Sequence, residues 1–292
     1  MFSPAVPSYG YARALRREII QRNQKMAKER ALASVSSYGP EEVVVYPSSE
    51  DGATHRNFFA ESYAAIVATP EWRKRLSKPH TGRRHLPKDS KWRELDACTS
   101  SDALLMNIFC HPQTLAEGKL HRLLSVDPDV QPQFGVRVAG QLENGHRDRT
   151  EVDMRMGDLL VEAKLTESDF QSCRAELVER YRDFSEVFDN ALLPRTEGGY
   201  GAYQLLRNVL AAFATNARFC VITDARRPDL REQWFAVMRC VRSYEVRMRC
   251  QMLTWQEMSG TLPDPFCRWL EEKYGIFAPG TEPQLDVSDW YW

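Results

Sequence analysis

Residues 150–164 read TEVDMRMGDLLVEAK and carry the strongest structural signal in the chain. Polar and apolar residues alternate on both sides of Gly157-Asp158, a pattern typical of two strands joined by a two-residue turn. In such a hairpin, residues equally distant from the turn face each other across the two strands. Asp153 is therefore expected opposite Glu162, and Glu151 opposite Lys164.

Side-chain alternation predicts one charged face and one apolar face for this hairpin. Three carboxylates and one amine would share the charged face: Glu151, Asp153, Glu162 and Lys164. The opposite face would point into the core and carry Val152, Met154, Val161 and Ala163.

Acids placed this close together repel one another unless a cation neutralises them. Lys164 offsets one charge, and a hard divalent cation bound by oxygen ligands would offset the rest. Such a cation can polarise a phosphate and activate water, while a neighbouring lysine stabilises the developing charge. The alternative is a solvated hairpin with a Glu151–Lys164 ion pair, because Glu-x-Lys alone is common by chance.

The remaining pattern predicts helices and strands in alternation around this hairpin. Helices are expected near residues 11–34, 57–67, 100–111, 114–124, 169–188, 202–215, 229–241 and 265–274. Strands are expected at residues 42–46, 131–139, 150–156, 159–166, 219–223 and 248–254. This order predicts an α/β fold with a mixed central sheet flanked by helices.

Asp153 followed by Glu162-Ala163-Lys164 on the next strand resembles the signature of PD-(D/E)XK nucleases, with Val152 where the signature has proline. The order of elements over residues 100–255 is also similar to that superfamily's restriction-endonuclease-like core. The resemblance implies that Asp153 and Glu162 bind Mg²⁺, with Mn²⁺ as a substitute, and that Lys164 is the catalytic lysine.

Two further site residues follow from the same resemblance. Members often carry an acid on the preceding helix, for which Glu117 is the first candidate and Asp102 the second. Many relatives carry a glutamine on the helix after the Glu-x-Lys strand, and Gln204 matches that position. A plain polar residue on an amphipathic helix explains Gln204 equally well.

Basic side chains concentrate in two segments that could follow a phosphate backbone. Residues 71–95 form a basic loop with two tryptophans, and the N-terminal helix carries several arginines. A solvated linker and a helix packed on the main domain are the respective alternatives. In the C-terminal third, helical spacing brings Arg231, Arg239 and Arg242 to one side.

Composition favours one large globular unit. The chain has 292 residues and a net charge of −1, which excludes a wholly basic nucleic-acid binder. Its seven cysteines include no Cys-x-x-Cys pair, so reduced thiols are expected. We expect an N-terminal helical extension with the basic loop at residues 1–95 and a nuclease core at residues 96–292. A cytoplasmic location and no membrane partner are expected, and a homodimer is left open.

These observations together predict a metal-dependent nuclease that acts on DNA rather than RNA. A non-catalytic nucleic-acid- or protein-binding module on the same fold is the runner-up. An unrelated α/β protein with a solvated hairpin is the third interpretation.

Overall fold

The predicted hairpin forms around Gly157, whose positive φ of 62° suits a residue without a side chain. It joins β4 (Arg147–Met156) to β5 (Leu159–Ala163). The two strands pair Met156 with Leu159 and Met154 with Val161, which is the expected register. The computed structural model describes residues 8–36, 42–80 and 92–281.

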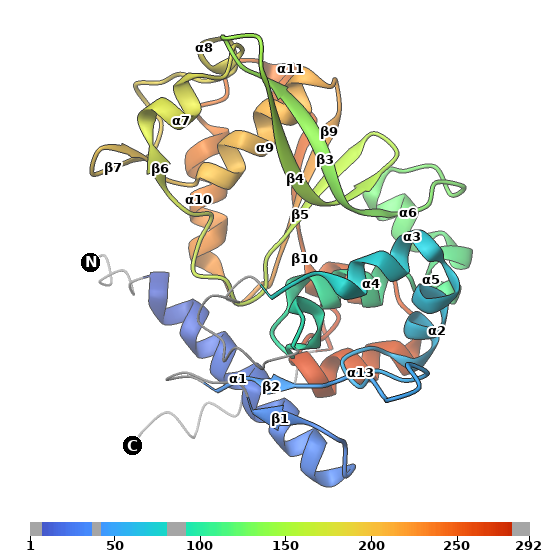
Figure 1. Ribbon diagram of the computed structural model, residues 1–292. Coiled ribbons are helices and arrows are strands. Elements are labelled where there is room, and N and C mark those ends of the chain that lie inside the picture. The colour runs from blue at the N-terminus through green and yellow to red at the C-terminus, as the bar shows by residue number, and fades with distance from the viewer. Residues whose placement is uncertain (1–7, 37–41, 81–91, 282–292) are drawn as a thin grey trace.

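Five strands form the central sheet in the order β10-β9-β5-β4-β3 (Figure 1). The strand β3 (Gln133–Gln141) pairs with β4 in antiparallel fashion. On the other side, β9 (Arg218–Thr223) runs parallel to β5, and β10 (Cys250–Thr254) runs parallel to β9. This mixed sheet with flanking helices confirms the fold class predicted from the sequence.

One face of the sheet is covered by helices that follow the hairpin in sequence. Leu160, Phe219 and Val221 share a buried cluster with residues of these helices. The helices are α7 (Ala175–Glu179), α8 (Phe184–Val187), α9 (Tyr203–Ala214), α10 (Pro228–Met238) and α11 (Tyr244–Met248).

The other face packs against helices from both ends of the chain. Leu159, Val161 and Ile222 share their cluster with these helices. They are α1 (Ser8–Glu29), α4 (Ser101–Phe109), α6 (Lys119–Leu124), α12 (Trp255–Ser259) and α13 (Asp264–Tyr274). Figure 1 shows α1 and α13 together, far from α8 and α11.

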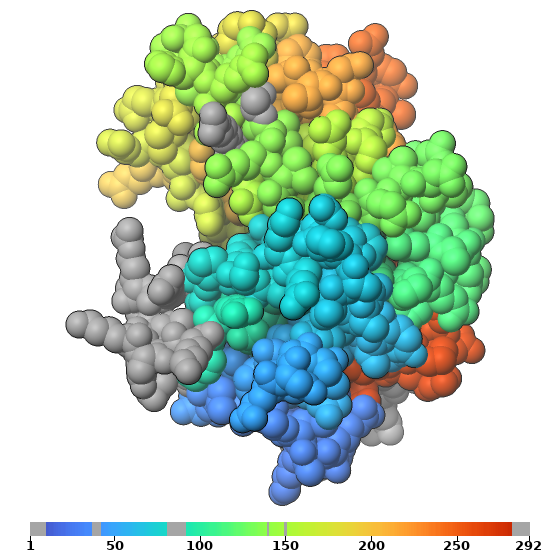
Figure 2. All heavy atoms as spheres, turned by 45° about the vertical axis from the view of Figure 1, so that its right-hand side comes forward, coloured from blue at the N-terminus to red at the C-terminus, as the bar shows by residue number. Residues whose placement is uncertain are grey.

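A smaller third cluster joins the N-terminal helices to α4. These elements are α2 (Ala60–Ala68), α3 (Pro70–Arg73) and the 3₁₀ turns η1 (Lys74–Ser77) and η3 (Glu94–Asp96). The helix α5 (Pro112–Glu117) separates α4 from α6, and the short strands β1 (Val35–Ser36) and β2 (Val44–Val45) pair beside α1. In Figure 2 these blue and cyan parts make the lower surface, against green β3–β4 residues above.

The hairpin departs from simple alternation at Asp153. Met154 packs in the cluster beneath α4, whereas Val152 packs in the cluster beneath α9. On β3, Phe134 and Val136 divide between the same two clusters, on either side of Gly135. The expectation that Val152 and Met154 share one face is therefore wrong. On both strands, the side chains before and after Gly135 and Asp153 pack on opposite sides of the sheet.

The single helix expected at residues 169–188 is also wrong. That segment contains β6 (Cys173–Arg174) and the separate helices α7 and α8; β6 pairs with β8 (Gly199–Tyr200), which also pairs with β7 (Arg195–Thr196). Between α7 and α8, the Arg182 N–H bonds the Gln141 carbonyl and the Glu143 N–H bonds the Arg180 carbonyl. Tertiary pairing with the end of β3 thus replaces helical hydrogen bonds there.

None of the helices in the described parts of the chain is long and apolar enough to cross a membrane.

Candidate active site

Asp153 and Glu162 come from neighbouring strands at the point where their backbone pairing stops. The β4–β5 ladder ends at Met154 and Val161. Beyond it, the Ala163 N–H donates to Oδ2 of Asp153 over 2.8 Å, so a carboxylate takes the place of a strand carbonyl. This bond ties Asp153 to the residue between Glu162 and Lys164.

Glu162 is 3% exposed, and both of its carboxylate oxygens have donors. Nζ of Lys164 lies 2.7 Å from Oε1, and Nδ2 of Asn208 on α9 lies 2.9 Å from Oε2. A buried carboxylate needs such partners, because an unpaired charge away from water is costly. Glu162 and Lys164 therefore form a buried ion pair at the end of β5.

The predicted pairing of Glu151 with Lys164 is wrong. Glu151 is exposed, stands opposite Arg137 on β3, and accepts a 2.7 Å hydrogen bond from Nη1 of Arg75. Because the strands separate after Val161, Lys164 never comes opposite Glu151. The solvated hairpin alternative, which required that ion pair, loses its main support.

Asp102 is the helix acid that lies near the hairpin. It sits in the first turn of α4, which Ser100 caps by accepting a hydrogen bond from the Ala103 N–H. Nη2 of Arg75 lies 3.2 and 3.1 Å from the two Asp102 carboxylate oxygens, and Lys78 bonds Oδ2. The negative charge of Asp102 acts on Asp153.

Glu117, the first candidate from the sequence, has local partners instead. It lies on α5, accepts a hydrogen bond from Gln113 and pairs with Lys119 at 2.9 Å. Pro112 starts this short helix and Gly118, with a φ of 66°, ends it, so Glu117 belongs to a turn separate from α4. The geometry therefore replaces Glu117 with Asp102 as the acid beside the hairpin.

The pKa of Asp153 reflects the negative charges gathered around it. Burial and the carboxylates of Glu162 and Asp102 raise the pKa of Asp153 well above its usual range, against the opposing effects of Lys164 and the Ala163 N–H. Burial alone would lower the pKa of Lys164, but the carboxylates of Glu162, Glu167 and Asp153 outweigh it and raise that pKa. Lys164 is therefore held as a cation, while Asp153 resists ionisation.

The oxygen ligands of this cluster suit a hard divalent cation, although Lys164 already occupies one of the two carboxylates. Among the residues that the structure describes, no group of three or more His, Cys, Asp or Glu side chains is arranged to hold a metal ion. Asp153 and Glu162 offer carboxylate oxygens, which Mg²⁺ prefers as ligands, and their mutual repulsion favours a bound cation. Lys164 now neutralises Glu162 and would have to share that carboxylate with an ion.

Helix α9 contributes two amide side chains on one face, since Gln204 and Asn208 are four residues apart. Asn208 bonds Glu162, whereas Oδ1 of Asn208 and Oε1 of Gln204 are buried without a hydrogen-bond partner among the described residues. Buried acceptors left unpaired in this way need an explanation. Sequence reasoning selected Gln204 and missed Asn208, although their helical spacing was a usable signal.

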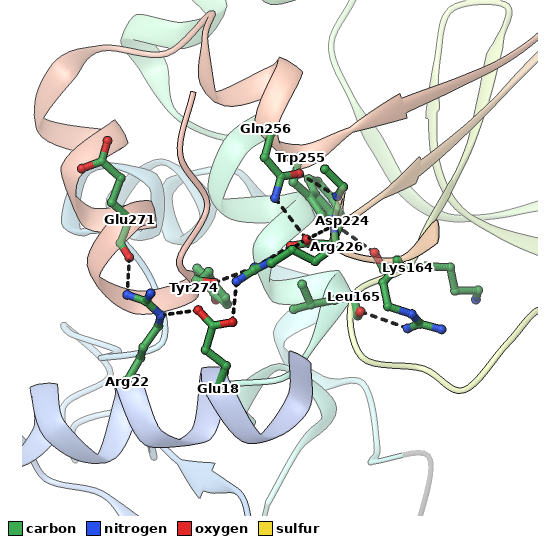
Figure 3. Close-up of polar contacts among 12 residues, drawn as sticks. Glu18, Arg22, Lys164, Leu165, Asp224, Arg226, Trp255, Gln256, Glu271 and Tyr274 are labelled. Carbon is green, nitrogen blue, oxygen red and sulfur yellow. Dashed lines mark hydrogen bonds and ion pairs between the residues drawn. The ribbon is translucent and has the colours of Figure 1, made fainter. Parts of the chain in front are cut away.

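The backbone of Lys164 and of the residues after it is held by side chains from other segments of the chain (Figure 3). The Trp255 indole donates to the Lys164 carbonyl over 2.9 Å, and Gln256 beside it bonds Asp224. Arg227, 1% exposed, donates to the carbonyls of residues 165, 167 and 168 while Asp229 neutralises it. Arg227 thus positions the chain that follows the lysine.

Two arginines of the C-terminal third have partners within the chain. Arg226 pairs with Asp224 and Glu18, as Figure 3 shows, and Arg242 donates to the Phe188 carbonyl. Since α10 ends at Met238, Arg239 and Arg242 lie beyond the helix on which they were expected to share a side with Arg231. Residues 81–91 of the basic loop lie outside the described residues.

Gly135 makes room for the Arg75 side chain. A methyl group at Gly135 would lie 2.2 Å from Nη1 of Arg75, and its φ of 62° disfavours other residues. We expect Gly135→Ala to lower the free energy of unfolding by about 2–3 kcal/mol, because it adds backbone strain and displaces Arg75 from Asp102. Urea denaturation of both proteins measures this.

Gly145 provides the matched control, since it also has a positive φ, of 79°, but has open space around it. Gly145→Ala should cost only the backbone strain of about 1 kcal/mol. Equal losses for the two variants would contradict a role for Gly135 in seating Arg75.

A five-stranded mixed sheet with two hairpin acids and a lysine at the end of β5 defines a protein of the restriction-endonuclease-like class. A family model described as "restriction endonuclease associating with ARP" matches residues 19–275, and the chain belongs to this family. Comparisons with curated proteins and with solved structures returned no significant match.

Proposed function

We propose that the protein is a metal-dependent nuclease that hydrolyses phosphodiester bonds. The observation that carries the proposal is the convergence of Asp153, Glu162 and Lys164 at the end of one hairpin, with Asp102 acting on the same group. Membership in a family described as restriction endonucleases supports it. A structural role alone does not explain why acids that repel each other are gathered there.

Each residue of the cluster has a role in this proposal. Asp153 and Glu162 would hold Mg²⁺ or Mn²⁺, and the bound ion would polarise the phosphate and lower the pKa of the attacking water. Lys164, kept cationic by its acidic neighbours, would stabilise the charge that develops on the phosphate oxygens. Asn208 would hold Glu162 in place, and Arg75 and Lys78 would hold Asp102.

DNA rather than RNA is the proposed substrate, because the family description names restriction endonucleases. A non-catalytic binding module is the second candidate. It is favoured by the Lys164–Glu162 ion pair, which already neutralises a carboxylate that catalysis would use for the metal.

Cleavage assays on linear, circular and single-stranded DNA distinguish these two functions. Mg²⁺ should support cleavage and EDTA should stop it. Lys164→Ala should lower the rate about 10²- to 10³-fold, because it removes a charge aimed at the transition state. Lys119→Ala, which changes a half-exposed lysine of another ion pair, is the control and should keep the wild-type rate. Cleavage that survives both EDTA and Lys164→Ala would refute the proposal.

A further inference from the structure

A polar cavity of about 270 Å³ lies beside the proposed catalytic cluster. Its walls come from α1, from the segments at β2 and after η1, from the segment around η3 that leads into α4, and from the chain just after β5. Ser101 and Glu167 both line it, and the Ser101 hydroxyl donates to Glu167 over 2.6 Å. Ser101 directly precedes Asp102, and Glu167 is three residues beyond Lys164. The cavity and the cluster therefore share two chain segments.

The lining combines an aromatic ring, basic groups and hydroxyls with three apolar side chains, those of Val43, Val45 and Ala97. Trp92 supplies the ring, and Arg16, His80 and Arg93 supply the basic groups. Hydroxyl groups come from Thr99, Ser100, Ser101 and Thr166. Two acids, Glu94 and Glu167, are also present, and Glu167 is already engaged by Ser101 and by the Leu165 N–H.

This combination matches the chemistry of a nucleotide. Bases stack on aromatic rings whatever their sequence, and arginines counter the charge of the phosphate. The cavity lies just below the usual range for small-molecule sites, about 300–1,000 Å³, so it can take at most one nucleotide and is far too small for a duplex. A base that is paired and stacked within a helix cannot enter such a cavity.

We infer that this cavity takes one unpaired nucleotide of the substrate strand, with its base against Trp92 and its phosphate near Arg16. The inference rests on the proposed function for the identity of the strand. The substrate class is then nucleic acid with an unpaired nucleotide next to the cleaved bond, such as a single-stranded end, a flap or a flipped base. Occupation of the cavity would set which phosphate reaches the cluster.

Binding measured without metal tests this inference separately from catalysis. Fluorescence anisotropy in EDTA compares a labelled thymidine oligonucleotide with a blunt duplex of equal length, using the full chain. Trp92→Ala and Arg16→Ala should each weaken oligonucleotide binding about 5- to 100-fold and leave duplex binding unchanged. Trp92→Phe keeps an aromatic ring and should restore most of the affinity.

Arg17→Ala is the matched control, because Arg17 is exposed, adjacent on α1 and outside the cavity lining. Equal losses for Arg16→Ala and Arg17→Ala, or a duplex that binds as tightly as the oligonucleotide, would overturn the inference. So would free thymidine monophosphate binding as tightly as the oligonucleotide, since the cavity would then serve a separate small ligand. If strand binding behaves as expected but Mg²⁺ supports no cleavage, the nuclease proposal fails and the cavity assignment stands.

Discussion

Asp153→Asn is expected to reduce Mg²⁺-dependent cleavage by more than about 10³-fold and, at the same time, to stabilise the metal-free protein. The loss follows because an amide is a weak metal ligand. The gain follows because the substitution removes a carboxylate that burial, Glu162 and Asp102 all destabilise. We expect the free energy of unfolding of the metal-free protein to rise by about 1–2 kcal/mol, and its melting temperature by about 2–8 °C.

The pH dependence of the metal-free protein follows from the same shift. The folded-state pKa of Asp153 is raised, so its stabilising contribution is complete below the unfolded pKa of about 4 and is lost as pH rises through the folded value. Metal-free wild type should therefore lose stability relative to Asp153→Asn over that range. Adding Mg²⁺ should raise the melting temperature of wild type alone.

Differential scanning calorimetry with EDTA and with Mg²⁺ measures both effects. Asp129→Asn is the control, because Asp129 is exposed and away from the cluster. It should leave cleavage and both melting temperatures unchanged. If the variant melts below wild type in EDTA, the Asp153 carboxylate does not destabilise the metal-free protein. If the variant keeps its Mg²⁺ response, Asp153 is not a metal ligand.

Lys273→Met is expected to raise the free energy of unfolding at pH 7 and to flatten its dependence on pH. Lys273 is fully buried among Tyr46, Trp269 and Tyr274, with Nζ 2.8 Å from Oδ1 of Asn23. Burial lowers the pKa of Lys273 to about 7, against the opposing effects of Cys98 and Glu272. Methionine fills a similar volume without a charge.

The sign follows from proton binding. Between the folded pKa of about 7 and the unfolded pKa of about 10.4, the unfolded chain holds a proton that the folded chain lacks. Stability should therefore rise with pH in that window, by about 1.4 kcal/mol per unit at most. Lys273→Met removes this slope, and Asn23 keeps a donor because the Tyr46 hydroxyl bonds the same oxygen.

Urea denaturation at pH 7, 8, 9 and 10 checks the slope. Lys28→Met changes an exposed lysine on α1 and should retain the wild-type slope. If Lys273→Met is less stable than wild type at pH 7 and keeps the same slope, then the buried lysine is not the titrating group.

Local periodicity was sufficient for the parts of this protein that depend on near neighbours in sequence. Alternation around Gly157-Asp158 determined the hairpin and its register next to the turn. Asp153 and Glu162 therefore lie on neighbouring strands, just beyond the last paired residues Met154 and Val161. The mixed sheet was also predictable, because sequence periods locate the helices and strands and their order along the chain favours a mixed arrangement.

Tertiary packing decided which charges meet. Lys164 pairs with Glu162 rather than Glu151 because the strands separate at Asp153, opposite the kink at Gly135 on β3. Asp102 rather than Glu117 lies beside the hairpin because α4 and α5 are separate helices. Asn208 and Arg227 reach the end of β5 from elements more than forty residues away. Side-chain partners at such sequence distances depend on how helices pack on the sheet, which no local pattern encodes.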